Sequence, residues 1–469
     1  MTRKALQARG RFSAYVAGLS EAIGHADRRG PLRDYCLGLV MPGERKSVEP
    51  MAAVTAPSRV AAQHQSLLHF VGQSAWSDEK VLAKVREMVL PKIEAHGPIE
   101  AWIIDDTGFP KKGRHSVGVS RQYCGELGKQ DNCQVAVSLS LANAWASLPV
   151  FWRLYLPESW AEDRQRCRKA GVPDEVCFAT KPQIALEQVR QAFDAGLARG
   201  VVLMDAAYGV DARLRVGVSA LGLSYVAGVF SNTLVFRPGF EPPPGYKRPE
   251  NARREPDVVS AKEVACGLGA EAWRIIPWRE GSAETLCGRF ARVRIHSAHR
   301  HDTPDPRAAE WLLFEWPEGE TEPTRYWLST LPEDIDFARL VELTKLRWRI
   351  ERDYQELKQE LGLGHFEGRG WRGFHHHATL CIAAYGFLIS ERETIPPSGP
   401  ARARLFGQTA LSQEHRTRRT ADPAGATRST LDRNRAAPPG SCPGARPPAL
   451  PLLRQMERHA PAKQTLMTQ

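Results

Sequence analysis

Residues 101–108 read Ala-Trp-Ile-Ile-Asp-Asp-Thr-Gly, so an apolar run leads directly into two aspartates and a turn-forming pair. This order predicts a buried strand that ends at Asp105 and is followed by a turn. The same pattern returns at residues 201–205, which read Val-Val-Leu-Met-Asp. The sequence therefore predicts two buried strands that each end in an aspartate.

The residues around these two strands predict further strands and a helix. Residues 134–141 alternate valine and leucine with smaller or polar residues, which is the period of a strand, and residues 150–156 form another strand candidate. Residues 181–195 place apolar side chains in a helical context, and glycines follow as at a helix end. Strands, then a helix, then a strand indicate an α/β fold with a mixed sheet and helices packed on it.

The segments before and after this α/β region have different predicted secondary structure. The first hundred residues are predicted to be mainly helical, and the region from 212 to 322 is β-like and irregular. The further candidates are helices at 59–70 and 81–93, strands at 223–230, 288–295 and 326–330, a long helix at 337–361 and an apolar helix at 376–390. Pro91 should end or kink the helix in which it lies.

These differences in predicted secondary structure and composition divide the chain into five segments. They are an N-terminal helical domain at 1–98, the first part of the α/β core at 99–211, a β-rich insertion subdomain at 212–322, the second part of the core with the long helix at 323–390, and a basic tail at 391–469. The tail holds 11 prolines and 12 arginines but a single aromatic residue, so it is predicted to be disordered. It either touches nucleic acid non-specifically or has no role.

Composition narrows the class of partner. The 469 residues include 64 Lys and Arg against 53 Asp and Glu, and a net charge of +11 suits a polyanion such as nucleic acid. The most apolar run, residues 378–389, is shorter than the roughly 20 residues that cross a bilayer. The N-terminus has no apolar stretch after its basic residues, so we expect a cytoplasmic protein that does not bind a membrane. The nine cysteines form no CxxC pair, and no zinc site is predicted.

Three carboxylates are the candidates for chemistry: Asp105 or its neighbour Asp106, Asp205, and Glu351 on the long helix. They lie 100 and 146 residues apart along the chain, so only the fold can bring them together. Each alone has an ordinary interpretation, since an aspartate at a strand end is often a turn residue and a helical glutamate is often a solvated ion-pair partner. The case for function therefore depends on their contexts.

The context of Glu351 is the most informative. Arg347, Glu351, Tyr354 and Lys358 follow the helical period and share one stripe, next to an apolar stripe of leucines and Ile350. This places Glu351 at the edge of the buried face, with cations suited to phosphate oxygens on either side. An ion-pair ladder within the helix would explain Glu351 with Arg347, but not the two buried aspartates.

The run Arg347-x3-Glu351-x6-Lys358 resembles the YREK signature of DDE-type insertion-sequence transposases, Tyr-x2-Arg-x3-Glu-x6-Lys. Thr344 stands where that signature has tyrosine, so no residue takes the tyrosine role. Other short segments that resemble the family lie at residues 42–51, 104–113, 116–119, 121–125, 204–209 and 357–369. The resemblance extends over about residues 30–390.

The resemblance implies an RNase H-like catalytic core with a β-rich insertion between the second aspartate and the glutamate. It implies that Asp105, Asp205 and Glu351 hold two Mg²⁺ ions, with Mn²⁺ as a possible substitute, and the family pattern selects Asp105 over Asp106. The reaction would be cleavage of double-stranded DNA at the terminal inverted repeats of an element, followed by strand transfer into target DNA. A homodimer is expected because two ends must be held at once.

Several other residues are candidates for contact with DNA. Arg347, Lys358, Lys111, Lys112 and Arg369 are placed on phosphates, although a solvated basic loop is the simpler interpretation of Lys111 and Lys112. The run of three histidines at 375–377 invites a metal site, but consecutive helical residues point in different directions, so surface histidines are expected. The N-terminal helices either bind DNA or only pack on the core.

Two alternatives to a transposase stay open at this point. One is a nuclease of the same fold that cleaves DNA without strand transfer. The other is a non-catalytic or decayed DNA-binding protein. The presence of all three carboxylates argues against the second alternative.

Overall fold

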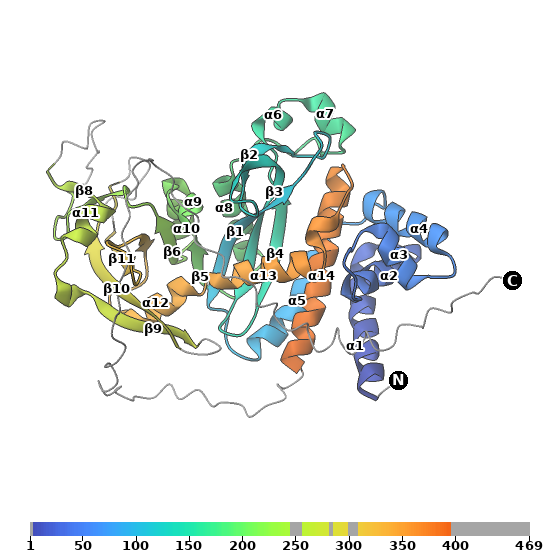
Figure 1. Cartoon of the computed structure of the whole chain (residues 1–469), viewed down its shortest axis with the longest axis horizontal. Helices are drawn as coiled ribbons and strands as arrows, with labels where there is room; N and C mark the ends of the chain where they lie inside the picture. The colour runs from blue at the N-terminus through green and yellow to red at the C-terminus, as the bar shows by residue number, and fades with distance from the viewer. Residues whose placement is uncertain (1–2, 244–255, 281–284, 299–307, 395–469) are drawn as a thin grey trace, which may run out of the picture. The chain divides into compact units, whose positions relative to one another are not determined.

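The computed structural model of the chain describes residues 3–243, 256–280, 285–298 and 308–394 (Figure 1). By their contacts these residues all belong to one compact unit. No helix among them is long and apolar enough to cross a membrane. The predicted tail beyond residue 394 lies outside the described residues.

One mixed sheet organises the molecule. Ten strands form it, and β4 pairs with β3 beside the path β2-β3-β1-β5-β6-β12-β11-β10-β9. The strands are β1 Ala101–Pro110, β2 Ser120–Cys124, β3 Lys129–Ala142, β4 Ser147–Leu154, β5 Val201–Met204, β6 Tyr225–Val229, β9 Arg274–Glu280, β10 Thr285–Ile295, β11 Glu310–Trp316 and β12 Arg325–Ser329. The pairs β1–β5 and β5–β6 are parallel and the others are antiparallel. This is an α/β fold of the RNase H-like type, as the sequence predicted.

The region predicted as a β-rich insertion continues the core sheet. β12 pairs with β6 on one side and with β11 on the other, so β9, β10 and β11 extend the sheet beyond β6. A separate two-stranded sheet, β7 Leu234–Phe236 with β8 Val258–Ser260, lies in the same region of the chain. The domain boundaries themselves stay predictions.

The first strand is longer than the sequence predicted. β1 does not end at Asp105 but continues to Pro110, so Asp105 and Asp106 lie in the middle of a strand. The reason is tertiary: β3 pairs with β1 over all ten residues, from Ala101–Ala142 to Pro110–Cys133. These ladder hydrogen bonds outweigh the local turn signal of the two aspartates and Gly108.

Helices cover the sheet and build the N-terminal region. Those of four residues or more are α1 Arg3–Ser20, α2 Arg29–Val40, α3 Val48–Thr55, α4 Val60–Gly72, α5 Asp78–Glu94, α6 Glu158–Ala161, α7 Arg164–Lys169, α8 Lys181–Asp194, α9 Ala206–Gly209, α10 Ala212–Ala220, α11 Ala261–Cys266, α12 Phe337–Lys345, α13 Trp348–Gln359 and α14 Trp371–Thr394. Pro91 does not end α5, because the helix continues for three residues after it. At this position in the last turn a proline removes little of the helix's hydrogen bonding.

The predicted long helix at 337–361 is two helices. α12 ends at Lys345 and α13 begins at Trp348, and Arg349 N donates to Leu346 O across the shorter i−3 spacing at the junction. The break allows α12 to contact β9 while α13 contacts β1 and β4. Periodicity along one segment could not show it, because each half follows the helical period.

α14 joins the N-terminal helices to the core. It contacts β4 as well as α2, α4 and α5. α14 ends at Thr394 and thus includes the first four residues of the predicted tail. Near this end, Arg11 binds the buried carboxylate of Glu391 at 2.6 Å. The three histidines 375–377 are buried in this helix, and the expectation that they lie on the surface is wrong. Burial is possible because each imidazole finds a backbone or hydroxyl partner.

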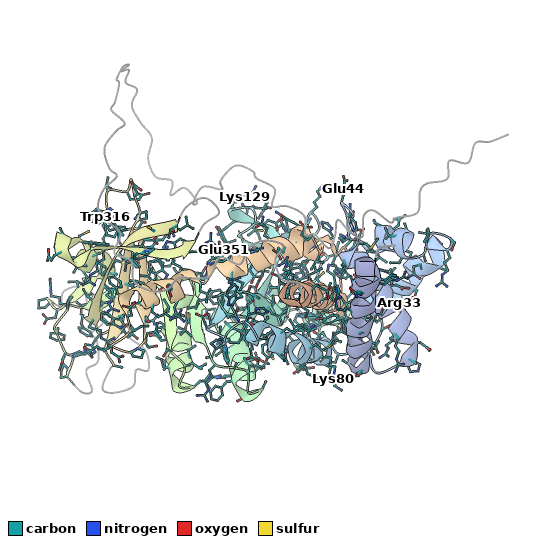
Figure 2. The ribbon with its side chains drawn as sticks, turned by 90° about the horizontal axis from the view of Figure 1, so that it is seen from below. Arg33, Glu44, Lys80, Lys129, Trp316 and Glu351 are labelled. Carbon is teal, nitrogen blue, oxygen red and sulfur yellow. The ribbon has the colours of Figure 1, made fainter. Side chains whose placement is uncertain are left out.

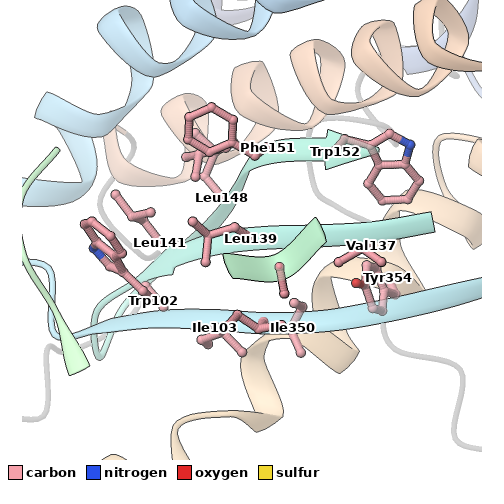
Figure 3. Packing of buried hydrophobic residues seen from close by; sticks show 14 of the residues in the cluster. Trp102, Ile103, Val137, Leu139, Leu141, Leu148, Phe151, Trp152, Ile350 and Tyr354 are labelled. Carbon is pink, nitrogen blue, oxygen red and sulfur yellow. The ribbon is translucent and has the colours of Figure 1, made fainter. Parts of the chain in front are cut away.

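The core beside the candidate site is apolar. Figure 3 shows Ile350 and Tyr354 of α13 together with side chains of β1, β3 and β4, among them Trp102, Val137 and Trp152. These residues are buried and belong to one continuous hydrophobic cluster. Burial of this face of α13 fixes the position of the helix that carries Glu351.

Candidate active site

The two aspartates lie next to each other on neighbouring strands. β1 and β5 are parallel, and their last recorded pair is Ile103 with Leu203, two residues before each aspartate. Asp205 follows β5 as the N-cap of α9, and its carboxylate accepts hydrogen bonds from Ala207 N at 3.0 Å and Tyr208 N at 3.2 Å. A strand–aspartate–helix order therefore fixes Asp205 beside Asp105, since a carboxylate is a favoured helix cap.

One guanidinium links the three predicted acids. Arg347 Nη2 lies 2.9 Å from Asp105 Oδ2 and 3.6 Å from Asp205 Oδ2, and Arg347 Nη1 lies 3.1 Å from Glu351 Oε1. Arg347 stands at the break between α12 and α13, and Glu351 follows one turn later on α13, where Figure 2 labels it. The structure thus brings Asp105, Asp205 and Glu351 to one place, around a cation of the chain itself.

The three carboxylates differ in their access to water. The Asp105 side chain is 13% exposed, that of Asp205 is 36% exposed and that of Glu351 is 68% exposed. Burial raises the pKa of Asp105 to about 7, against the lowering effect of Arg347, and the negative charges of Asp205 and Asp106 raise it further. Burial therefore disfavours the charged form of Asp105, and Arg347 favours it.

The guanidinium of Arg347 is largely buried among the three carboxylates. Burial alone would lower the pKa of the guanidinium, but Asp105, Asp205 and Glu351 together raise it above its usual value. Its side chain is 22% exposed. Arg347 is therefore a charged group bound inside the site and not a surface arginine.

Asp106 faces a different set of partners. Its Oδ2 accepts hydrogen bonds from Lys181 Nζ at 3.1 Å and from Tyr208 Oη at 3.0 Å. Its backbone N–H donates to Asp105 Oδ1 at 2.8 Å. The carboxylate of Asp106 is thus already neutralised by Lys181, whereas that of Asp105 faces Asp205 and Arg347.

The donor chemistry of the site fits a hard divalent cation. Carboxylate oxygens are the ligands that Mg²⁺ prefers, and Asp105, Asp205 and Glu351 supply only oxygens. No group of three acidic, histidine or cysteine side chains in the described part of the chain is close enough to surround one ion as it stands, and the guanidinium of Arg347 lies among the three acids. Residues that fit the metal are thus present, together with a cation that competes for the same oxygens.

The predicted DNA contacts fall into two groups. Lys358 Nζ donates to Gly108 O at 2.7 Å and pairs with Glu126 at 2.6 Å, and Lys111 Nζ donates to Phe366 O at 2.9 Å, while burial lowers the pKa of Lys111. Lys112 and Arg369 are exposed, and their side chains have no hydrogen-bond or ion-pair partner within the described ranges. Only the second group presents free positive charge.

Sequence reasoning missed three supports of the site. Lys181 neutralises Asp106, Tyr208 donates to the same carboxylate, and Ser138 shares a hydrogen bond of 2.8 Å with Tyr354 Oη. Tyr208 and Tyr354 stood in the quoted motifs but received no role. Lys181 and Ser138 carried no signal, because only pairing in three dimensions brings them to the strand of Asp105.

Comparison with known proteins identifies the family of the chain. The model of the DDE superfamily endonuclease family matches residues 18–285, a segment that includes Asp105 and Asp205. A curated relative, the probable transposase for insertion sequence element IS701 from Microchaete diplosiphon, is 30% identical over 200 residues. The matched region is 42% of this chain and 48% of the relative, so the chain spans about half the length of the relative it matches. Because the family match covers more than half of the sequence, the chain belongs to the DDE superfamily of endonucleases.

Proposed function

We propose that this chain is an insertion-sequence transposase that cleaves DNA at the ends of its element and joins those ends to target DNA. The observation that carries the proposal is the contact of one guanidinium with Asp105, Asp205 and Glu351, which come from three separate parts of the chain. Membership of the endonuclease superfamily and the similarity to the IS701 protein support it.

In this proposal Asp105, Asp205 and Glu351 hold two divalent metal ions, Mg²⁺ or Mn²⁺ in its place. The carboxylates of Asp105, Asp205 and Glu351 would be the protein ligands of these ions. Such a pair of ions, when bound, makes the attacking oxygen more nucleophilic and stabilises the leaving oxygen. The separate engagement of Asp106 with Lys181 and Tyr208 favours Asp105 over Asp106 as the ligand.

The reaction has two displacements at phosphorus. Water attacks the phosphodiester at the element end, a new P–O bond forms, and the P–O3′ bond breaks to release a 3′-hydroxyl. That hydroxyl then attacks a target phosphodiester in the same manner. Both substrates are double-stranded DNA: the terminal inverted repeats first and the target second.

The residues of the chain supply position and charge. Arg347, already placed among the acids, balances their negative charge and can transfer its contacts to a phosphate oxygen. Tyr354, through Ser138, holds α13 against β3 and so sets the distance between Glu351 and the aspartates. Lys358 fixes the last turn of that helix to the backbone of Gly108.

The cellular setting follows from this function. Element ends are cut and joined in pairs, so we propose that the active form on DNA is a homodimer. Its place of action is the cytoplasm, where the DNA lies. Each of these statements depends on the transposase assignment.

The test is an assay of nicking and strand transfer with Mg²⁺ on DNA that carries the element's own ends. Asp105→Asn, Asp205→Asn and Glu351→Gln are compared with wild type and with Arg352→Gln, an exposed residue of α13 that pairs with Glu356. We expect cleavage and joining from wild type and Arg352→Gln but neither product from the three acid variants. Cleavage without any joined product would favour a nuclease of the same fold, and cleavage by an acid variant would remove that residue from the mechanism.

A further inference from the structure

A pair of adjoining hollows lies beyond the end of β1. One, of about 500 Å³, is lined by residues of the α6–α7 segment together with His115, Arg369 and Gly370. The other, of about 270 Å³, is lined by Lys111, His115 and Arg369 among others. His115 and Arg369 line both, so the two hollows adjoin, and we refer to them together as the depression.

The backbone around Arg369 is fixed on both sides. Val117 N donates to Arg369 O at 2.9 Å, and Trp371 N donates to Ala170 O, at the end of α7, at 2.8 Å. The side chain of the buried Gln134 in turn donates to Val117 O at 2.6 Å. The strap of residues 368–370 therefore holds an exposed arginine at a set position between the β1–β2 loop and α7.

The other wall of the depression is fixed in the same way. The indole of Trp160 is buried and donates to Val119 O at 2.8 Å. The guanidinium of Arg166 stacks on that indole at 3.6 Å and donates to Arg114 O at 2.9 Å. Asp163 caps α7 by accepting from Arg166 N at 2.9 Å. The short α6–α7 segment is thus anchored to the loop that follows β1.

Free positive charge gathers on this framework. Lys112, Arg114, Lys169 and Arg369 are exposed, and no hydrogen bond or ion pair joins their side chains to any described residue. The acids nearby are already engaged, since Glu367 pairs with Arg45 and Asp163 caps α7. We call Lys112, Arg114, Lys169 and Arg369 the Arg369 surface.

We propose that the Arg369 surface binds the phosphate backbone of the element-end duplex on one side of the cut site. This inference rests on the proposed function and deepens it by naming where the duplex lies. Lys169 and Arg369 line the hollows, and Lys112 and Arg114 belong to the loop after β1 that supplies Lys111 and His115 to the lining. Exposed cations in this arrangement match a polyanion, and contacts of Lys and Arg with phosphates position a duplex without reading its sequence.

The strand geometry gives the separation from the cut site. Lys111 follows Asp105 by six residues of extended chain, which is about 20 Å at ~3.3 Å per residue. Lys111 precedes Lys112 of the Arg369 surface, so for a duplex that runs along β1, at about 3.4 Å per base pair, the proposal places the contacted phosphates about six base pairs from the cut phosphodiester.

The first experiment measures DNA binding as a function of salt. The surface variant combines Lys112→Gln, Arg114→Gln, Lys169→Gln and Arg369→Gln, and a matched control combines Lys80→Gln, Lys92→Gln, Arg190→Gln and Arg213→Gln, which are exposed cations elsewhere. Both are made in the Asp105→Asn chain, and binding to element-end DNA is followed by fluorescence anisotropy. The slope of log K against log salt should fall by about 3.6 in the surface variant, since each of the four phosphate contacts contributes about 0.9.

The second experiment locates the contact on the DNA. Uncharged methylphosphonate linkages are placed singly along the duplex, and we expect weaker binding for linkages about six base pairs from the cut and no such loss with the surface variant. Thermal unfolding verifies that both variants are folded. A slope unchanged in the surface variant, or lowered equally in the control, overturns the proposal. If the DNA binds as expected but wild type neither cuts nor joins it, the surface stands and the proposed function fails.

Discussion

Cations are used differently in two regions of this molecule. Around the carboxylates, three cations of the described residues are paired within the protein: Arg347 with Asp105, Asp205 and Glu351, Lys181 with Asp106, and Lys358 with Glu126 and the backbone of Gly108. On the Arg369 surface the cations have no such partners among the described residues. Both regions border β1, one at its middle and one just beyond its end.

The difference follows from burial. A partly buried cation would be destabilising without an opposite charge, so Arg347 and its acids must be balanced in the free protein. Exposed cations remain hydrated and need no partner, which leaves them available to phosphates. Charge near the carboxylates is therefore part of the folded structure, whereas charge on the Arg369 surface contributes little to folding.

The largest expected effect is a loss of DNA cleavage when one of the three carboxylates of the first region is removed. Asp105→Asn, Asp205→Asn and Glu351→Gln should each lower the rate of metal-dependent DNA cleavage at least about a hundredfold, because each removes an oxygen charge that the metal needs. Single-turnover cleavage on element-end DNA measures the loss. A tenfold loss or less in any variant would show that its acid is dispensable.

The next effect removes the internal cation. Arg347→Gln should lower the free energy of unfolding at pH 7 by about 2 kcal/mol, because it leaves Asp105 and its neighbours without a counter-charge. It should also raise the affinity for Mn²⁺ about tenfold in the absence of DNA, because a competitor for the same oxygens is gone. Urea unfolding and calorimetric titration measure the two.

Arg352→Gln is the control for this change, since it removes an equal charge from an exposed site on the same helix. It should leave both quantities nearly unchanged. An Arg347→Gln variant that binds Mn²⁺ no better than wild type contradicts the competition between guanidinium and metal.

A third prediction concerns a buried base that is neutral in the fold. His377 accepts from Tyr35 Oη and donates to Gly362 O, and burial lowers its pKa to about 4. Since the unfolded chain takes up this proton near pH 6.5 and the folded chain does not, stability is lost as the pH falls from about 6.5 to 4. His377 should contribute about 2 kcal/mol of this loss between pH 7 and pH 5.

Urea unfolding of wild type and His377→Asn at the two pH values measures that contribution. The variant should be less stable at pH 7 but lose less stability on acidification. An equal loss in both proteins would mean that other groups, such as His375 or His376, carry the pH dependence.

The smallest effect sharpens the second region. Arg369→Gln alone should change the free energy of unfolding by no more than about 0.5 kcal/mol, as expected for an exposed residue without partners. Its affinity for DNA at low salt should fall several-fold, equally for specific and unrelated sequences. A destabilisation above about 1 kcal/mol would place Arg369 in the folded framework and not on a free surface.

The main elements of this fold could be predicted because their signals are local. The apolar runs before Asp105 and Asp205, and the period of residues 134–141, correspond to β1, β5 and β3. Predictions failed where distant partners decided: the extension of β1 to Pro110, the break at Arg347, and the burial of three consecutive histidines. No periodicity within a segment reports on the strand or helix that packs against it.

The sequence by itself determined an α/β protein with two strand-borne aspartates, a glutamate on a basic amphipathic helix, and an excess of positive charge. Only the tertiary structure decided that Arg347 lies among the three acids, that Asp106 belongs to Lys181 and Tyr208, and that the free cations gather around Arg369. The physical reason is range. Hydrophobic period and strand propensity act between near neighbours in the chain, whereas pairing of charges depends on distances that exist only after folding.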